Sequence, residues 1–427
     1  MSNSSKDSID TVSKLCPQNV CTGCFACKQV CAKGAIHFKE DKGFLYPEID
    51  ASLCVDCGLC TKVCPVLNPR IAANDNQENA VSYAIWNNNR MDRMNSSSGG
   101  TFSALADKVL KEGGIVYGAA WDDSMQLRHI GVEDANSLEV LRRSKYVQSN
   151  TDGVFKDVKL QLKTGRRVLF CGTPCQIAGL LSFLGNKDYP NLVTVGVVCH
   201  GVPSQRSFDQ YLQEIEKDNN VKVFDCNFRS KKRGWRTDLN LILSAKDVNN
   251  KLVAIDKQLS NNVYMNAFLK QYFLRESCYN CPFKGENNGY FADIMLSDAW
   301  SLWAAIPWGQ VDFSKGVSAV ATNTDKGREF LRGCADGITA FERPYAEYAS
   351  NSGLRSACKP GNNDAAFEYL KTHSWMETQA NYFPLTLRQK MPLITRLIIG
   401  ENNAIRFKKI IKKIGNYIHV VVKSQNL

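Results

Sequence analysis

Hydrophobic and polar positions alternate in blocks along the middle of the chain, and these blocks predict strands separated by helices. Short apolar runs predict strands at 81–86 and 114–121, and a buried strand that ends in a loop at 192–204. Between the first two, residues 95–114 predict a Ser/Gly loop that leads into an amphipathic helix. Residues 167–185 predict a buried strand, a Gly-Thr-Pro turn and a helix. We therefore expect α and β elements that alternate around a sheet.

The pattern becomes less regular in the second half of the chain. Further strands are predicted at 221–228 and 238–245, and a helix is predicted at 263–274. Residues 275–300 are rich in polar and turn-forming residues, and we expect mostly loop there. Residues 66–80 have the same character and predict a linker near the N-terminus.

Two stretches near the N-terminus repeat one cysteine rhythm, C-x2-C-x2-C-x3-C. The eight cysteines are Cys21, Cys24, Cys27, Cys31, Cys54, Cys57, Cys60 and Cys64. This is the spacing of a bacterial two-cluster ferredoxin, in which the fourth cysteine of each repeat binds the other 4Fe–4S cluster. The first three cysteines of each repeat should therefore share a cluster with the last cysteine of the other. Structural zinc usually takes two separated pairs of ligands and fits this spacing poorly.

Four neighbouring positions bear on this prediction. Gly23 and Gly58 are expected to ease the loops around the clusters. Ala32 stands where a ferredoxin usually has proline, which changes nothing chemical. Cys16 lies outside the rhythm and is interpreted as a spare thiol.

Length and cysteine usage support a redox protein. A chain of 427 residues is long enough for two or three domains. Its 17 cysteines are an odd number in a chain much larger than disulfide-rich secreted domains, which favours metal or redox chemistry in a reducing compartment. No run of eighteen apolar residues and no secretory signal are apparent, so we expect a cytoplasmic protein.

The net charge of +11 is unevenly distributed. Residues 384–427 contain nine Lys and Arg against one acid, Glu401, and so supply +8 of the total. A broad nucleic-acid surface is therefore a poor explanation of the charge. Residues 404–414 predict a helix with one apolar and one basic face. It could contact the inner face of an anionic membrane, or pack on its own domain.

Four cysteines of the second part lie at predicted strand ends or in loops, where ligands often lie: Cys175, Cys199, Cys278 and Cys281. They could hold a third cluster, or be small buried hydrophobic residues. There is no Walker P-loop and no clean G-x-G-x-x-G after a strand. The Ser/Gly segment 96–100 could offer backbone N–H groups to a phosphate, or simply cap a helix.

Several motifs together resemble the family of β subunits of coenzyme F-420-reducing hydrogenases and dehydrogenases. They are SSSGGTFSAL (96–105), RRSKYVQSN (142–150), VLFCGTPCQIAGL (168–180), VVCHGVPS (197–204), FRSKKRGW (228–235) and the cysteine-containing segment 277–300. The resemblance implies an α+β fold in which a two-cluster ferredoxin-like domain precedes a mixed α/β flavin-binding catalytic domain and a basic C-terminal extension. The expected parts are 12–68, 80–152, 153–325 and 330–427.

The resemblance also implies cofactors and contacts. It implies FAD, and a third 4Fe–4S cluster held by Cys175, Cys199, Cys278 and Cys281. The expected flavin contacts are Ser98, Gly99, Gly100, Lys145, Tyr146, Gln148, Gly172, Thr173, Pro174 and Arg229. His200 and Lys145 are the candidate catalytic residues, with a packed loop histidine as the alternative for His200. Lys231 and Trp235 would shape the substrate side with Arg229, whereas Asp298 and Trp300 could equally be structural.

The function that follows is an iron–sulfur flavoprotein oxidoreductase. It would exchange electrons between a hydride carrier or small substrate, F-420-like, and one-electron carriers. A role in polysaccharide metabolism is one setting for this activity. The alternative is a relay subunit of a hydrogenase or dehydrogenase complex, whose partner would be another oxidoreductase subunit or an electron-transfer protein.

Overall fold

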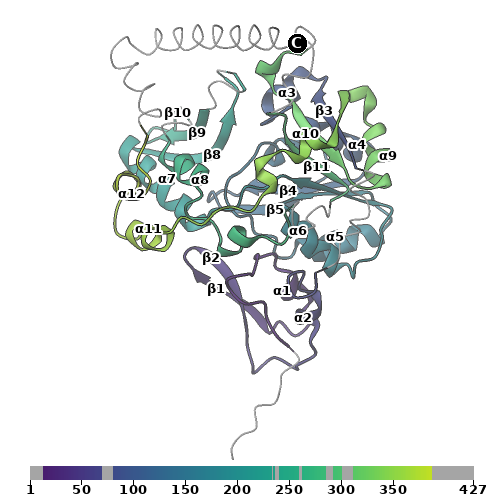
Figure 1. The fold of residues 1–427 in the computed structure, drawn as a ribbon, viewed down its shortest axis with the longest axis horizontal. Helices are drawn as coiled ribbons and strands as arrows, with labels where there is room; N and C mark the ends of the chain where they lie inside the picture. The colour runs from purple at the N-terminus through teal and green to yellow at the C-terminus, as the bar shows by residue number, and fades with distance from the viewer. Residues whose placement is uncertain are drawn as a thin grey trace, which may run out of the picture.

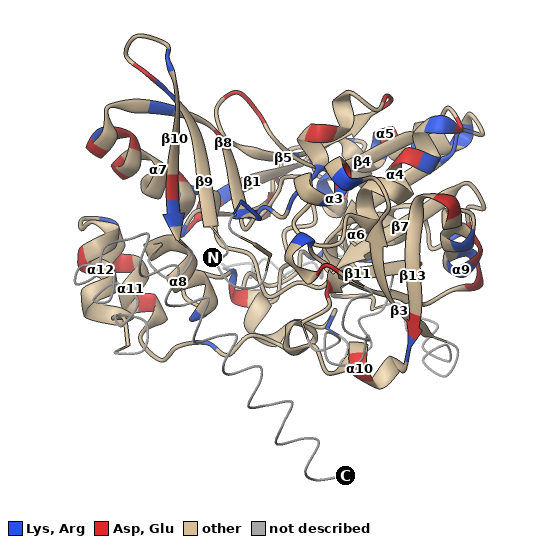
Figure 2. Ribbon diagram, turned by 90° about the horizontal axis from the view of Figure 1, so that it is seen from above, with Lys and Arg blue, Asp and Glu red and all other residues tan. Residues whose placement is uncertain are grey.

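The computed structural model describes residues 13–69, 80–232, 234–235, 240–258, 262–284, 292–300 and 311–386. The predicted basic helix 404–414 lies outside these residues, so its proposed membrane contact stays a prediction. Within the described ranges, no helix combines the length and the apolar composition that a membrane crossing requires. Acidic and basic residues are interspersed along the described elements (Figure 2), and residues 384–427 supply +8 of the net charge of +11.

The N-terminal part contains two short helices and one hairpin. Helices α1 (Ala26–Val30) and α2 (Leu59–Val63) flank an antiparallel pair of strands, β1 (Ile36–Asp41) and β2 (Phe44–Ile49). Figure 1 shows this part at one end of the molecule, next to α5 (Val154–Lys163) and α6 (Pro174–Phe183) of the larger part. The hairpin thus lies between the two cysteine repeats.

An eight-stranded mixed sheet forms the centre of the larger part. Its strands, in spatial order, are β13 (Ile338–Arg343), β3 (Val81–Asn87), β12 (Ser318–Thr322), β11 (Ile294–Asp298), β7 (Leu192–Val197), β6 (Val168–Gly172), β4 (Ile115–Trp121) and β5 (Leu127–Val132). The pairs β11–β7, β7–β6 and β6–β4 are parallel, and the others are antiparallel. The predicted mixed α/β architecture is confirmed for this sheet.

Helices cover both faces of this sheet, which explains why its strands are apolar on both sides. One face packs against α5 (Val154–Lys163) and α6 (Pro174–Phe183), and the other against α4 (Thr101–Lys111) and α9 (Asp325–Arg332). Successive residues of one strand enter opposite cores, as a β-strand requires. Val168 belongs to the first core and Leu169 to the second. Two shorter helices, α3 (Arg90–Asn95) and α10 (Tyr345–Ala349), complete the region.

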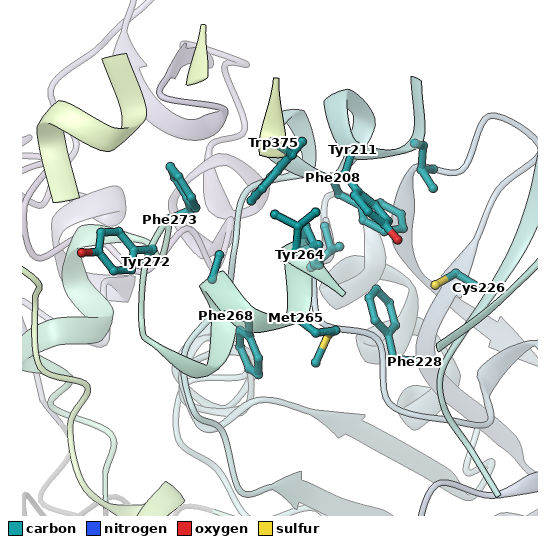
Figure 3. Close-up of a cluster of buried hydrophobic side chains, with 14 of the residues drawn as sticks. Phe208, Tyr211, Cys226, Phe228, Tyr264, Met265, Phe268, Tyr272, Phe273 and Trp375 are labelled. Carbon is teal, nitrogen blue, oxygen red and sulfur yellow. The ribbon is translucent and has the colours of Figure 1, made fainter. Parts of the chain in front are cut away.

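A smaller unit packs beside the large sheet. Its antiparallel sheet contains β8 (Val221–Ser230), β9 (Asn240–Asp247) and β10 (Leu252–Gln258). Helices α7 (Gln205–Asn219), α8 (Val263–Leu269), α11 (Asn363–Leu370) and α12 (Trp375–Tyr382) pack with it. Tyr264 of α8 lies at the centre of an aromatic core with Phe208 and Trp375 (Figure 3). Its hydroxyl donates to the backbone oxygen of Tyr146 at 2.7 Å, which connects this core to the candidate site.

Most predicted elements are present, but two predictions are wrong in part. The helix predicted at 263–274 ends at Leu269, because Gln271 and Phe273 have positive φ values of 66° and 61°. These turns bury Tyr272 and Phe273 in the aromatic core. The segment 275–300, predicted to be mostly loop, contributes β11, a strand inside the large sheet.

The large sheet also draws strands from all three parts predicted after the N-terminal one. β3 lies in 80–152, β11 in 153–325 and β13 in 330–427, and they share one sheet. Residues 330–386 are therefore structurally continuous with the preceding chain. The predicted boundaries between these parts stay predictions.

Candidate functional site

The two cysteine repeats adopt the same backbone path. In each, a five-residue helix is preceded by a left-handed residue, Phe25 (φ 62°) or Gly58 (φ 68°). A second left-handed residue lies two positions earlier, Gly23 (φ 66°) or Asp56 (φ 50°). The helices end in extended residues, Cys31 and Cys64. The predicted glycine turns are confirmed, and their non-glycine counterparts carry strain that only the surrounding loop can maintain.

The first predicted quartet surrounds one cavity. Its lining includes all four members, Cys21, Cys24, Cys27 and Cys64, and Cys60 also reaches it. The Cys16 thiol, interpreted above as spare, lines the same cavity and hydrogen bonds with Cys21 and Cys64. These bonds lower the pKa of Cys21 to about 6 and that of Cys64 to about 7.

The donor set suits a cluster better than a single ion. Among the residues that the structure describes, no group of three or more His, Cys, Asp or Glu side chains is placed to hold one metal ion. Thiolates around a 4Fe–4S cube bind different irons, so they lie farther apart than ligands of one ion. Four cysteines around one cavity therefore fit the predicted group.

The second quartet lies closer to solvent. Of its members Cys31, Cys54, Cys57 and Cys60, Cys57 is exposed and only Cys60 is buried. The large hydrophobic side chains of Leu53 and Val55, beside Cys54, are 50% and 60% exposed. This repeat is therefore the outer of the two, meaning the one more exposed to solvent.

The four cysteines of the second part also come together. Cys175 lies in the first turn of α6, Cys199 follows β7, and Cys278 lies in a 3-10 helix, Glu276–Asn280, just before Cys281. Burial first, and then the nearby thiols of the other three, raise the pKa of Cys175 above its usual range. The Thr173 hydroxyl lies 3.2 Å from the Cys175 sulfur. The structure thus assembles the predicted third quartet from separate segments of the chain.

Helix α6 joins the first and third quartets. A Cβ on Gly179 would lie 3.0 Å from the Cys24 sulfur, so this helix contacts the first quartet directly. Gly179 is four residues after Cys175, which is about 6 Å along a helix axis. The residue that belongs to the third quartet and the residue that contacts the first quartet are therefore about one helical turn apart on α6.

Predicted flavin contacts around Ser98 are engaged with the sheet. Ser98 donates its hydroxyl to the Val317 carbonyl oxygen at 2.9 Å, and the Gly99 N–H donates to Ser318 Oγ at 3.0 Å. The Gly99 amide is not available to a phosphate while that bond is made. Gly100 has a φ of 85° and begins α4. The next residue, Thr101, has a buried hydroxyl without a hydrogen-bond partner in the described residues.

A polar and aromatic network lies beside these residues. Arg229 forms an ion pair with Asp298 and lies over the Trp300 ring, 5.2 Å from its centroid. Trp300 stacks on Trp235 at 4.6 Å. The Lys231 ammonium donates to three backbone oxygens, including that of Ser98, and burial lowers its pKa to about 7.

Several atoms of this network have no hydrogen-bond partner among the described residues. They are Arg229 Nη2, Asp298 Oδ1 and His200 Nε2, all buried. His200 packs edge-on against Phe268 at 5.1 Å, and Phe268 packs against Tyr146 at 4.7 Å. Buried polar atoms normally find partners, so each of these unpaired atoms is a candidate contact for a bound polar group.

The remaining predicted contacts lie on other segments. Lys145 is half-buried and donates to the Arg142 backbone oxygen at 2.7 Å, and desolvation of its ammonium lowers its pKa to about 7. Thr173 caps α6 in a capping box, with Pro174 at the first helical position and Gly172 ending β6. Gln148 donates its amide to the Thr22 backbone oxygen at 3.0 Å, in the N-terminal part.

One residue that the sequence reasoning missed is Arg275. Its guanidinium, 1% exposed, reaches from the segment before Cys278 to the first quartet. Its position three residues before the C-x2-C pair was a local signal, but nothing in the sequence indicates which distant thiol it meets.

Comparisons with known proteins point in one direction. Residues 165–345 match the family model that describes the C terminus of the beta subunit of coenzyme F420 hydrogenase/dehydrogenase, and residues 20–68 match a 4Fe-4S dicluster domain. The chain is 22% identical over 382 residues to the F component of the F(420)H(2) dehydrogenase of Methanosarcina mazei, one of the subunits of that enzyme. This match covers 85% of the present chain and 96% of that protein.

Two further matches are more partial. The chain is 24% identical over 331 residues to the coenzyme F420-dependent sulfite reductase of Methanocaldococcus jannaschii, covering 74% of this chain but 46% of the relative. A solved chain of the F420-reducing [NiFe] hydrogenase complex from Methanosarcina barkeri, derivatised with xenon, is 18% identical. It gives a TM-score of 0.39 and covers 75% of this chain and 92% of the solved one.

The two family models and the Methanosarcina mazei relative confirm the resemblance indicated by the motifs. They indicate a dicluster 4Fe–4S domain at residues 20–68 and the C-terminal domain of a hydrogenase/dehydrogenase β subunit at residues 165–345. They give no support to a role in polysaccharide metabolism.

Proposed function

We propose that this chain is an FAD-dependent oxidoreductase with three 4Fe–4S clusters. Its residues match a 4Fe–4S dicluster domain, followed by the C-terminal domain of the coenzyme F-420 hydrogenase/dehydrogenase β subunit. It exchanges electrons between an F-420-like hydride carrier and one-electron carriers. The observation that carries this proposal is the placement of the third quartet. Helix α6 carries Cys175 and also contacts Cys24 at Gly179. This supports a path for electrons between the N-terminal part and the larger part.

The buried polar atoms without a hydrogen-bond partner support a flavin site in the larger part, at the catalytic end of this electron path. Thr101 Oγ1, Arg229 Nη2, Asp298 Oδ1 and His200 Nε2 are polar groups that an isoalloxazine ring and its phosphates could satisfy. Flavin supplies the conversion between two-electron hydride chemistry and one-electron transfer. Arg229 would place positive charge beside the ring, and the Trp235–Trp300 pair would exclude water.

A relay subunit of a larger complex is the second candidate. It is favoured by the outer repeat, where the exposed Cys57 lies among exposed Leu53 and Val55. Such a surface suits contact with another electron-transfer protein. The Methanosarcina mazei relative, which this chain covers over most of its length, is itself named as a dehydrogenase subunit.

The first test is a cofactor count on anaerobically purified protein. We expect about twelve irons, matching acid-labile sulfide and one FAD per chain. Cys281→Ser should reduce the iron to about eight, because it removes a ligand of the third cluster. The matched control is Cys358→Ser, which replaces an exposed cysteine outside every quartet and should leave the iron unchanged.

Two results would contradict the proposal. Eight irons and no flavin, even after reconstitution with FAD, would leave a two-cluster ferredoxin on a domain of another function. Equal iron in the two serine variants would exclude the third cluster. The two candidate functions separate by turnover, because a relay subunit would show only diaphorase activity until its partner is added.

A further inference from the structure

Arg275 is a buried cation at the junction of the two parts. It follows the aromatic segment after α8 and precedes the 3-10 helix that carries Cys278. Its Nε donates to the Cys21 backbone oxygen at 2.6 Å, and its Nη2 donates to the Leu45 backbone oxygen at 2.9 Å. The same Nη2 lies 3.7 Å from the Cys21 sulfur, within hydrogen-bond range for sulfur.

The guanidinium is held in this orientation from several sides. Gln148 Oε1 accepts from its Nη1 at 3.0 Å, and the Tyr46 ring lies under its centre at 4.2 Å. The Phe44 ring lies 5.5 Å away. A Cβ on Gly23 would come within 2.7 Å of Nη1, so only glycine leaves the room this side chain uses.

The charge has no carboxylate partner in the described residues. Its contacts there are backbone oxygens, one amide oxygen, two aromatic rings and the Cys21 thiol. A buried charge without a counter-charge is strongly unfavourable. The negative charge nearest to the Arg275 guanidinium would be the Cys21 thiolate, together with the cluster that this thiolate would bind.

We propose that Arg275 raises the reduction potential of the first cluster and so makes it easier to reduce than the second. The inference rests on the proposed function only in that Cys21 is a ligand of the first cluster. Reduction of a cluster adds one electron, and so one negative charge, to it. A cation and an N–H···S bond stabilise the reduced form, and both act on cluster potentials.

The second repeat lacks this device. Cys54 is the counterpart of Cys21, and no Arg or Lys side chain in the described part of the chain donates to its sulfur. The Arg275 carbonyl oxygen also accepts the Cys278 N–H at 2.9 Å. One residue thus contacts the first quartet with its side chain and the third with its backbone. It would draw an electron to the inner cluster before the outer one.

The test is an EPR-monitored redox titration of the full chain, with cluster signals assigned by their loss in Cys57→Ser. Arg275→Gln should make the first cluster at least tenfold harder to reduce relative to the second. For a one-electron couple, tenfold corresponds to about 59 mV. Arg275→Lys keeps the charge but loses the forked contacts, so it should shift the potential in the same direction by less.

The matched control is Thr151→Val. The buried Thr151 hydroxyl donates to the Cys24 backbone oxygen at 3.0 Å across the same junction, without a contact to a thiol. This variant should leave both potentials near those of the wild type. An equal potential of the first cluster in Arg275→Gln and wild type would overturn the proposal.

Loss of the first cluster would also be decisive. If Arg275→Gln loses the first cluster, the reduction potential of that cluster is measured in Arg275→Lys instead. A potential equal to that of the wild type would then overturn the proposal. Loss in both Arg275 variants, with Thr151→Val intact, would make the residue purely structural and overturn it too. If instead Cys21→Ser keeps all iron, the ligand assignment is wrong, and the proposed function fails independently of Arg275.

Discussion

The two cysteine repeats share a spacing and a backbone but have different surroundings. Both wrap a left-handed pair of residues into a five-residue helix. The first is covered by α6 and by Arg275, whereas the second exposes Cys57. The comparison shows that local sequence determines how a loop can hold a cluster, while its neighbours determine which role the cluster can have. The buried repeat faces the candidate catalytic region, and the exposed repeat suits external electron carriers.

The strongest way to break this comparison is to remove one cluster at a time. Cys57→Ser should lose about four irons and the exchange of electrons with external one-electron carriers. Cys24→Ser should lose a similar amount of iron, from the first cluster. It should also stop electron transfer between the second cluster and the catalytic region. Iron analysis and rapid reduction kinetics would measure both effects. Unchanged iron in Cys57→Ser would refute the ligand assignment.

Acid should destabilise the larger part of the protein through His129, a buried histidine of β5. Burial lowers its pKa to about 4, and its ring lies between Ser149 Oγ at 2.9 Å and the Cys171 backbone oxygen at 3.0 Å. Between about pH 6.5 and about pH 4 the unfolded chain binds a proton that the folded chain does not. Stability is therefore full above this window and falls as the pH drops, by up to about 1.4 kcal/mol per unit.

The measurement is denaturant unfolding of wild type and His129→Gln across this pH window. The variant should lose this part of the pH dependence and keep the part due to carboxylates. Parallel stability curves over the window would show that His129 does not titrate as inferred.

A smaller effect is expected where α6 meets the first repeat. Gly179→Ala would bring a methyl group within 2.8 Å of the Cys24 Cβ and 3.0 Å of its sulfur. Alanine favours helices, but overpacking should dominate and destabilise the junction by about 1–3 kcal/mol. The matched control is Gly361→Ala, because nothing lies within 4 Å of a Cβ there.

Thermal unfolding and the rate of electron transfer between the two parts would check this prediction. Gly179→Ala should lower both, and Gly361→Ala should lower neither. An equal effect of the two variants would mean that the contact between α6 and Cys24 is not close in solution.

The sequence predicted local features well, because they depend on neighbours in the chain. Cysteine spacing indicated the dicluster part, and apolar runs indicated the central strands β3, β4, β6 and β7. It did not reveal β11, a five-residue strand ending in Ser297 and Asp298 within a turn-rich segment. That strand is stabilised by its place between β7 and β12, which no local pattern records.

For the candidate site, the sequence by itself indicated which cysteines could bind clusters. The chain order and residue types pointed to Cys175, Cys199 and the C-x2-C pair, but only the fold brings these segments together. Arg275 belongs entirely to the tertiary structure, because the thiol it contacts is 254 positions away in the chain. Long-range burial and charge pairing depend on what packs nearby, and folding alone decides that.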